Sequence, residues 1–247
     1  MTPTTLDLGW TLSAPSRTDL WSRFIAEQKV ASIAEIGVFR GEFAEQILGA
    51  CPDITRYYLI DPWRHLDDWD KPANVKDGKF DNFYNAAMAR TEPYSDKRVV
   101  LRGRTTEVLH EISDDELDLA YIDGDHTLRG ITIDLIRAWP KVKAGQFVGG
   151  DDFSLRLWQH KGDYEPTLVF PYAVYFAEAV GAPIYALPFG QFLIHKIDSG
   201  FEFRDLTGTY KELGLRKAFR QQARQSASPK PTSPDAPAGL LSRLRRR

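Results

Sequence analysis

Acidic residues follow two apolar runs of the sequence, and they are the first feature that could do chemistry. Asp123 ends the run 117–122, and Asp151 and Asp152 end a second run 28 residues later. If both runs are strands of one parallel sheet, their tips are neighbours and three or four carboxylates share a small volume. They would raise one another's pKa values, and a hard divalent cation with oxygen ligands would remove the repulsion. The alternative is that Asp125 caps the next helix and Asp152 faces solvent.

His126 follows the first of these acids closely and is the best candidate for a general base. An imidazole whose pKa lies near neutral can take the proton of a hydroxyl group. The alternative is a histidine at a helix N-terminus that only hydrogen-bonds the loop. Among the other histidines, His160 is the one to test. Surface or packing roles are expected for the remaining three, His65, His110 and His195.

A second motif, Glu35-Ile-Gly37-Val-Phe-Arg-Gly41, lies where an apolar strand pattern gives way to a helical one. Glycines at such a turn let a ligand approach the backbone, and the helix N-terminus offers free N–H groups. A tight turn chosen for packing would leave the same pattern.

Asp61 ends the next strand pattern, 20 residues after Gly41. An acid at that place accepts hydrogen bonds from ribose hydroxyls in dinucleotide sites. The alternative is an ordinary turn made by Asp61 and Pro62.

Aromatic residues gather in and around two segments, 63–80 and 154–167, that interrupt the regular pattern as insertions or lids. Their side chains could wall a substrate pocket, or they could simply pack against the body of the protein. The residues concerned are Trp63, Trp69, Phe80, Tyr84, Trp158 and Tyr164.

These side chains must be positioned by elements that alternate between strand and helix patterns. We predict strands at 30–36, 57–60, 98–101, 117–122 and 146–148, and helices at 17–28, from 42, 83–90, 106–112, 128–139 and 171–180. Residues 184–187 and 191–197 should form a hairpin. The predicted fold is α/β: a doubly wound, mostly parallel Rossmann-like sheet with helices on both faces and a C-terminal antiparallel hairpin.

The combination of these motifs resembles the class I S-adenosylmethionine-dependent methyltransferases. It is carried by Glu35-x-Gly37-x-x-x-Gly41, Asp61, the run 117–126 with Ile-Asp-Gly-Asp-His, and Gly150-Asp-Asp152. The branch it is most similar to includes macrocin-type and related antibiotic-sugar O-methyltransferases. The resemblance spans roughly residues 30–197.

The resemblance implies a role for each matching position. Glu35, Gly37 and Gly41 would hold the amino-acid end and backbone side of S-adenosylmethionine, and Asp61 its ribose. Gly103 and Thr105 would border the adenine. In metal-dependent members the ligands correspond to Asp123, Asp151 and Asp152, so Mg²⁺ is the implied ion. Asp123 and, from its own chemistry, His126 are the candidate catalytic residues.

The expected reaction is methyl transfer to a hydroxyl oxygen of a small hydroxylated molecule. One alternative is a nicotinamide-dependent oxidoreductase on a similar fold, although its Gly-x-Gly-x-x-Gly fingerprint fits this chain poorly. Another is a cofactor-binding fold that serves as a non-catalytic interaction module. The pattern predicts neither the acceptor nor the oligomeric state.

The chain of 247 residues, 43% of them hydrophobic, suits one domain with extensions. We predict a helical lead-in at 1–29, the binding domain at 30–208 and a disordered Pro/Ser-rich tail at 209–247. Residues 215–247 hold nine Lys/Arg and one acid, so the tail could touch nucleic acid or an anionic surface, or simply be solvated. The single Cys51 excludes a disulfide framework. With no secretory signal or spanning segment expected, the predicted location is the cytoplasm.

Overall fold

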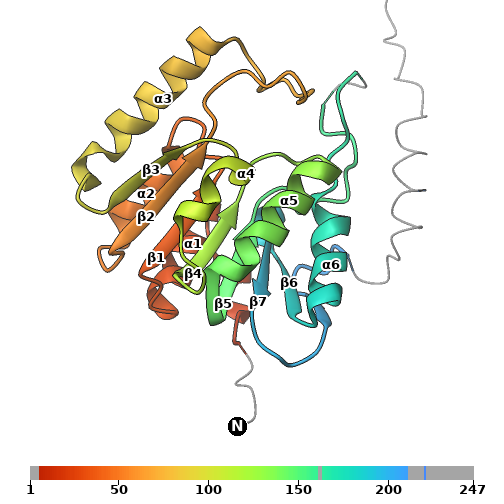
Figure 1. Cartoon of the computed structure of the whole chain (residues 1–247). Helices are drawn as coiled ribbons and strands as arrows, with labels where there is room; N and C mark the ends of the chain where they lie inside the picture. The colour runs from red at the N-terminus through yellow and green to blue at the C-terminus, as the bar shows by residue number, and fades with distance from the viewer. Residues whose placement is uncertain (1–5, 161–162, 211–219, 221–247) are drawn as a thin grey trace, which may run out of the picture.

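The computed structural model of the chain describes residues 6–160, 163–210 and 220. In these residues, eight strands form one sheet in the order β3-β2-β1-β4-β5-β7-β6-β8 (Figure 1). All neighbouring strands are parallel except around β7, which runs antiparallel to both β5 and β6. The strands are β1 (Ser32–Ile36), β2 (Arg56–Asp61), β3 (Arg98–Arg102), β4 (Leu117–Ile122), β5 (Val142–Gly150), β6 (Pro183–Leu187), β7 (Gln191–His195) and β8 (Glu202–Asp205).

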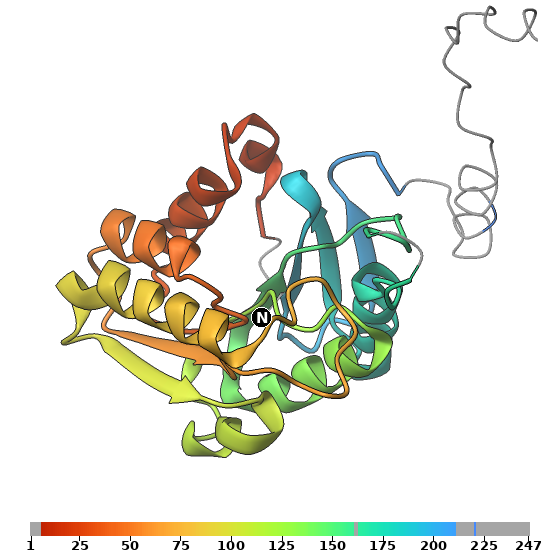
Figure 2. The ribbon, with the colours of Figure 1, turned by 90° about the horizontal axis from the view of Figure 1, so that it is seen from above.

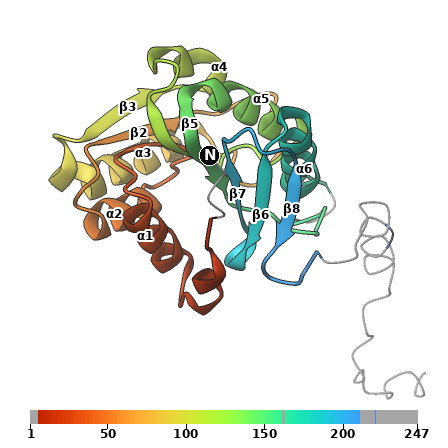
Figure 3. The same ribbon diagram turned by 90° about the horizontal axis from the view of Figure 1, so that it is seen from below.

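Helices cover both faces of this sheet, as Figures 2 and 3 show. One face carries α1 (Arg17–Glu27), α2 (Glu42–Ala50) and α3 (Asp77–Thr91); the other carries α4 (Thr105–Val108), α5 (Leu128–Ala138) and α6 (Val169–Val180). Each face buries its own hydrophobic cluster. The predicted doubly wound fold with a C-terminal antiparallel pair is therefore confirmed. None of the helices in the described ranges is long and apolar enough to cross a membrane.

Local sequence explains most of these elements. Every residue of β4 is buried, as expected for a strand covered on both sides. Helix α1 begins where predicted, because the Ser16 side chain accepts a hydrogen bond from the Asp19 N–H. Its apolar residues, including Trp21 and Phe24, are fully buried against the sheet. Cys51 is free and buried.

Helix α3 and strand β8 are among the elements that differ from the sequence-based prediction. Helix α3 begins at Asp77, six residues before the predicted start, so the insertion is shorter than 63–80. The helix buries only Phe80, Ala87 and Thr91, which leaves a weak apolar period. Strand β8 was not predicted. It is a four-residue edge strand with alternating charges, and such strands lack the apolar signal of a central one.

The sheet order places a crevice where the site is expected. The chain winds from β1 through β2 to β3 on one side, and β4 then pairs with the other edge of β1. Connections leave the carboxyl ends of β1 and β4 toward opposite faces, which is the usual ligand site of an open parallel sheet. The two loops also touch there: a Cβ added at Gly37 would lie 2.2 Å from the carbonyl oxygen of Asp123.

The predicted disordered tail at 209–247 lies outside the described residues except for residues 209, 210 and 220. The described body ends on Tyr210, whose hydroxyl donates to the carbonyl of Phe153 and whose ring stacks on Phe170 at 4.6 Å. We predict that a variant ending at residue 212 keeps the melting temperature and cofactor affinity of the full chain, because the removed segment is rich in Pro, Ser and Ala. A variant ending at residue 205 should melt lower, since it loses the Tyr210 contacts. A large drop in melting temperature for the first variant would contradict the prediction.

Candidate active site

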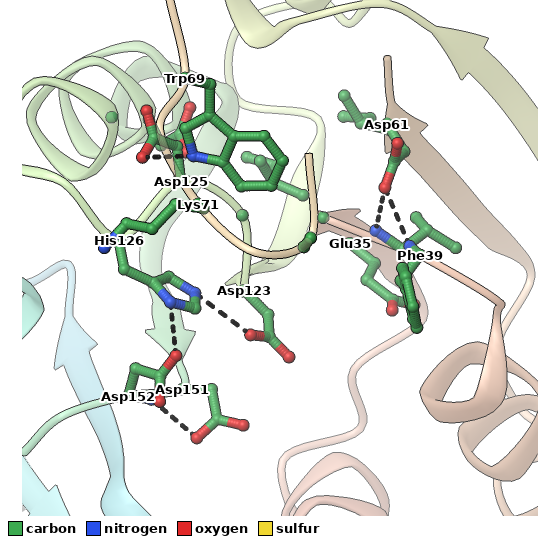
Figure 4. Close-up of a pocket in the computed structure, with 18 of the residues that line it drawn as sticks. Glu35, Phe39, Asp61, Trp69, Lys71, Asp123, Asp125, His126, Asp151 and Asp152 are labelled. Carbon is green, nitrogen blue, oxygen red and sulfur yellow. Dashed lines mark hydrogen bonds and ion pairs between the residues drawn. The ribbon is translucent and has the colours of Figure 1, made fainter. Parts of the chain in front are cut away.

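A cavity of about 970 Å³ opens at the carboxyl ends of β1, β2, β4 and β5. On one side of it lie Asp61 and the loop after β1 that holds Phe39 and the motif glycines (37–41, the glycine loop) (Figure 4). On the other side lies a cluster of acids with one histidine: Asp123, His126, Asp151 and Asp152. All of the predicted site residues line this cavity except Gly41. They are Glu35, Gly37, Asp61, Gly103, Thr105, Asp123, His126, Asp151 and Asp152.

Asp61 holds the loop that follows β1. Its Oδ2 accepts the backbone N–H groups of Val38 and Phe39 at 3.0 and 2.9 Å, and its Oδ1 accepts that of Trp63 at 2.8 Å. Burial raises the pKa of Asp61 to about 6, against the lowering effect of these three donors. The carboxylate therefore shapes the loop whether or not it also touches a ribose.

Phe39 occupies a strained place in this loop. Its φ of 55° lies in the left-handed region, which bulky side chains avoid. Two hydrogen bonds hold the Phe39 backbone in this conformation. The Asp61 carboxylate accepts from the Phe39 N–H, and the Trp63 indole N–H donates to the Phe39 carbonyl at 2.7 Å. Such over-determined strain is typical of ligand-binding loops.

The glycines of the motif have packing reasons of their own. Gly37 has a φ of 93° and lies against the backbone of Asp123 and Gly124, so no side chain fits there. Gly41 has a φ of 75° and precedes α2, with Ala87 of α3 too close for a Cβ. The tight-turn alternative thus accounts for both glycines, and Gly37 also lines the cavity.

Gly103 and Thr105 border the cavity beyond β3. The groups packed against Gly103 and against the Thr105 side chain, however, belong to the interior of the protein. A Cβ at Gly103 would lie 2.4 Å from a methyl carbon of Val108. The Thr105 hydroxyl donates to buried Asp134 at 2.6 Å. What these two residues present to the cavity is therefore mainly backbone and the start of α4.

Glu35 lies on β1 and is buried. Its Oε2 accepts a hydrogen bond from the Tyr57 hydroxyl at 2.7 Å. Burial raises the pKa of Glu35 to about 8, more than the Tyr57 bond lowers it. A cationic group arriving in the cavity would favour the ionised form.

Replacing Glu35 by glutamine should change how stability depends on pH. The pKa of Glu35 is about 8 in the folded chain and 4.5 in its ordinary state. The protonated carboxyl group therefore contributes its full stabilisation below pH 4.5, and this contribution is lost as the pH rises through 8, because the buried group must then ionise. Glutamine cannot ionise, so without cofactor the variant should be more stable than wild type above pH 8, by on the order of a few kcal/mol. Urea unfolding from pH 5 to 9 measures this, with exposed Glu27→Gln as control. Parallel pH profiles for wild type and Glu35→Gln would contradict it.

His126 lies between two carboxylates. Its Nδ1 is 2.6 Å from Asp152 Oδ2, and its Nε2 is 3.4 Å from Asp123 Oδ1. Among the described residues, these three side chains form the group whose potential ligand atoms lie within 4.8 Å of one another. Burial would lower the pKa of His126, but the two carboxylates outweigh it and raise the pKa to about 10. This raised pKa differs from the near-neutral pKa expected for a general base.

Asp151 is turned toward different partners. Its Oδ2 accepts from Arg17 of α1, and its Oδ1 accepts from the Gln191 side-chain amide at 2.6 Å and the Asp152 N–H at 2.7 Å. Burial and then the charge of Asp123 raise the pKa of Asp151, while Arg17 opposes them. The structure thus groups His126, and not Asp151, with Asp123 and Asp152, which differs from the predicted ligand set in one member.

Sequence reasoning missed Arg17 and Gln191. A weak signal exists for each. Arg17 is a cation in the first turn of a helix, where the helix dipole disfavours it. Gln191 is a fully buried amide at the start of the apolar strand β7, and a buried amide needs partners.

The segment between β2 and α3 crosses toward α5 (orange in Figure 2). Trp69 donates its indole N–H to Asp125 Oδ1 at 3.0 Å, and buried Lys71 donates to the carbonyls of Glu165 and Pro166 at 2.6 and 3.3 Å. The two insertions are therefore joined beside the cavity. Of the six aromatics considered as pocket walls, only Trp69 and Phe80 line it. Trp63 is fully buried against Tyr84, which is the packing alternative.

Comparison with known proteins places this site in context. Residues 34–153 match the family model described as a methyltransferase domain. No curated protein sequence matches the chain significantly.

Several solved structures share the fold. A putative caffeoyl-CoA O-methyltransferase from Staphylococcus aureus superposes with a TM-score of 0.55 at 16% identity, covering 72% of this chain and 82% of that one. An O-methyltransferase from Bacillus cereus, solved with SAH, gives 0.52 at 15% identity over 73% and 80% of the two chains. TomG from Streptomyces achromogenes, an O-methyltransferase of tomaymycin synthesis solved with SAM, gives 0.51 at 15% identity over 78% and 91%. At these identities the likeness concerns the fold.

Proposed function

We propose that the chain is a class I S-adenosylmethionine-dependent methyltransferase, in keeping with the methyltransferase-domain match of residues 34–153, and that it methylates a hydroxyl oxygen of a small hydroxylated molecule. The observation that carries this proposal is the cavity itself, which joins the glycine loop on β1 to the Asp123–His126–Asp152 cluster on β4 and β5. One cavity thus holds both a place for the methyl donor and groups that can accept the proton of a hydroxyl group.

The residues present fit the cofactor. S-adenosylmethionine supplies a methyl group on a positively charged sulfur and carries an ammonium group, so anionic side chains suit it. Buried Glu35 would face the amino-acid end, and Asp61 would face the ribose while holding its loop. Gly103 and Thr105, with the start of α4, would border the adenine.

The acceptor hydroxyl must lose its proton as its oxygen bonds to the methyl carbon and the carbon–sulfur bond breaks. Asp123 is the proposed proton acceptor, because its carboxylate lies in the cavity with His126 beside it. His126, as an imidazolium held by Asp152, would stabilise the negative charge that develops on the oxygen. Alignment of the hydroxyl with the methyl group is the other task of the cavity.

The residues also fit a divalent cation. The carboxylates Asp123, Asp151 and Asp152 all line the cavity and offer the oxygen donors that Mg²⁺ prefers. These three acids would hold the ion, which would supply Lewis acidity that lowers the pKa of a hydroxyl.

Metal removal tests that part of the proposal. Extensive chelation should abolish methyl transfer, and added Mg²⁺ or Mn²⁺ should restore it, because the hydroxyl would otherwise keep its ordinary high pKa. Asp151→Asn should reduce turnover far more than it reduces cofactor affinity. Full-rate methylation by thoroughly metal-free protein would refute metal assistance and leave Asp123 and His126 as the catalytic pair.

The proposed function is tested with the full chain in two steps. Calorimetry with S-adenosylmethionine, S-adenosylhomocysteine and NAD should show binding of the first two only. Transfer of a labelled methyl group to a panel of small hydroxylated, amine and thiol compounds should then yield label on oxygen. Binding of NAD in place of S-adenosylmethionine, or labelling only of nitrogen or sulfur acceptors, would overturn it.

A further inference from the structure

Arg17 reaches the acid cluster from a helix that lies outside the matched residues 34–153. Its Nη1 pairs with Asp151 Oδ2 and lies 3.4 Å from Asp123 Oδ2. The guanidinium also sits 5.1 Å from the centre of the Phe43 ring. The side chain is about one-third exposed, at 34%, and lines the cavity.

Hydrogen bonds from Trp21 of helix α1 hold the helix beside Asp151. The fully buried indole of Trp21 donates to Gln191 Oε1 at 2.9 Å, and the Tyr121 hydroxyl donates to the same oxygen at 2.9 Å. Gln191 in turn donates to Asp151 Oδ1 at 2.6 Å. These buried and partly buried hydrogen bonds fix the position of α1 relative to Asp151, and so the point from which the Arg17 side chain extends.

The charges of the cluster are already balanced in part by the protein. Asp151 has the Arg17 guanidinium as its cationic partner, and Asp152 Oδ2 lies 2.6 Å from His126 Nδ1. Asp123 lies 3.4 Å from the guanidinium and 3.4 Å from the His126 imidazole. The repulsion that would call for a divalent cation is therefore reduced by side chains, one of which comes from α1.

We propose that Arg17 is a built-in competitor of the divalent cation for Asp123 and Asp151. This inference rests on the metal site of the proposed function. A carboxylate oxygen that accepts from a guanidinium cannot give the same lone pair to a metal, and two cations repel at such short range. The ion must displace Arg17, so Arg17 weakens metal binding and keeps the cluster stable without it.

The test compares Arg17→Gln with Arg23→Gln, a matched variant in the same helix whose arginine forms an exposed pair with Glu27. Mn²⁺ is titrated into each full-length protein by calorimetry, and melting is followed in chelator and in excess Mn²⁺. We expect Arg17→Gln to bind Mn²⁺ roughly tenfold tighter than wild type or more. It should also melt lower in chelator and show a larger rise with Mn²⁺. Arg23→Gln should behave as wild type in both measurements.

Arg17→Lys keeps the charge without the planar fork and should give an intermediate affinity, which guards against misfolding of the glutamine variant. Equal or weaker Mn²⁺ binding by Arg17→Gln would overturn the proposal, and so would the absence of Mn²⁺ binding in every variant. S-adenosylmethionine binding, measured in parallel, separates these results from failure of the methyltransferase function. Tighter binding in Arg17→Gln together with metal-independent turnover would uphold the competition and refute metal activation.

Discussion

Replacing Asp123 by asparagine should lower the rate of methyl transfer by roughly 10²–10⁴-fold. The carboxylate is the proposed acceptor of the hydroxyl proton, and asparagine cannot take up a proton at neutral pH. The same change also removes the negative charge of Asp123, which lies 3.4 Å from Arg17 Nη1 and 3.4 Å from His126 Nε2. Single-turnover rates with saturating S-adenosylmethionine measure the effect, and calorimetry should show a much smaller change in cofactor affinity.

Asp114→Asn is the matched control, since Asp114 is an exposed partner of Lys141 and precedes β4, at the end of the strand opposite the cavity. Its rate should equal that of wild type. A folded Asp123→Asn variant that retains the wild-type rate would exclude Asp123 as the proton acceptor. A loss confined to cofactor affinity would instead assign it to holding the amino-acid end of S-adenosylmethionine.

Replacing Asp61 by alanine should weaken S-adenosylmethionine binding by at least roughly tenfold. The structure adds a reason beyond the predicted ribose contact: three backbone N–H groups, those of Val38, Phe39 and Trp63, lose their acceptor. The strained Phe39 would then relax, and the loop would have to be reordered when the cofactor binds. Isothermal calorimetry gives the affinity.

Two further variants interpret the Asp61 result. Asp61→Asn keeps one acceptor oxygen and should lose less affinity than alanine. Asp81→Asn, which removes the exposed carboxylate that pairs with Arg102, should leave binding unchanged. Unaltered affinity in a folded Asp61→Ala variant would remove Asp61 from the cofactor site.

Much of the fold was predictable because its signals are local. Runs such as 117–122 are apolar because the strand is buried along its whole length. A helix with a capping residue, such as Ser16 before α1, can be assigned its first residue from the sequence. Where burial is slight, as in α3, or a strand is short and charged, as in β8, the pattern is weak and the prediction was incomplete. The division into 1–29, 30–208 and 209–247 stays a prediction.

The residues that line the cavity could be named from the sequence because they end consecutive strands, and parallel strands end at one edge. The sequence by itself therefore determined the doubly wound fold and which acids face one cavity. Their partners were decided only by the tertiary structure. Arg17 and Asp151 are 134 residues apart, and Asp61 accepts from N–H groups more than 20 residues away. A pKa depends on which charges and donors surround a group and on how deeply it is buried. The raised pKa of His126 therefore depends on packing, which brings Asp152 of a different strand end against the imidazole.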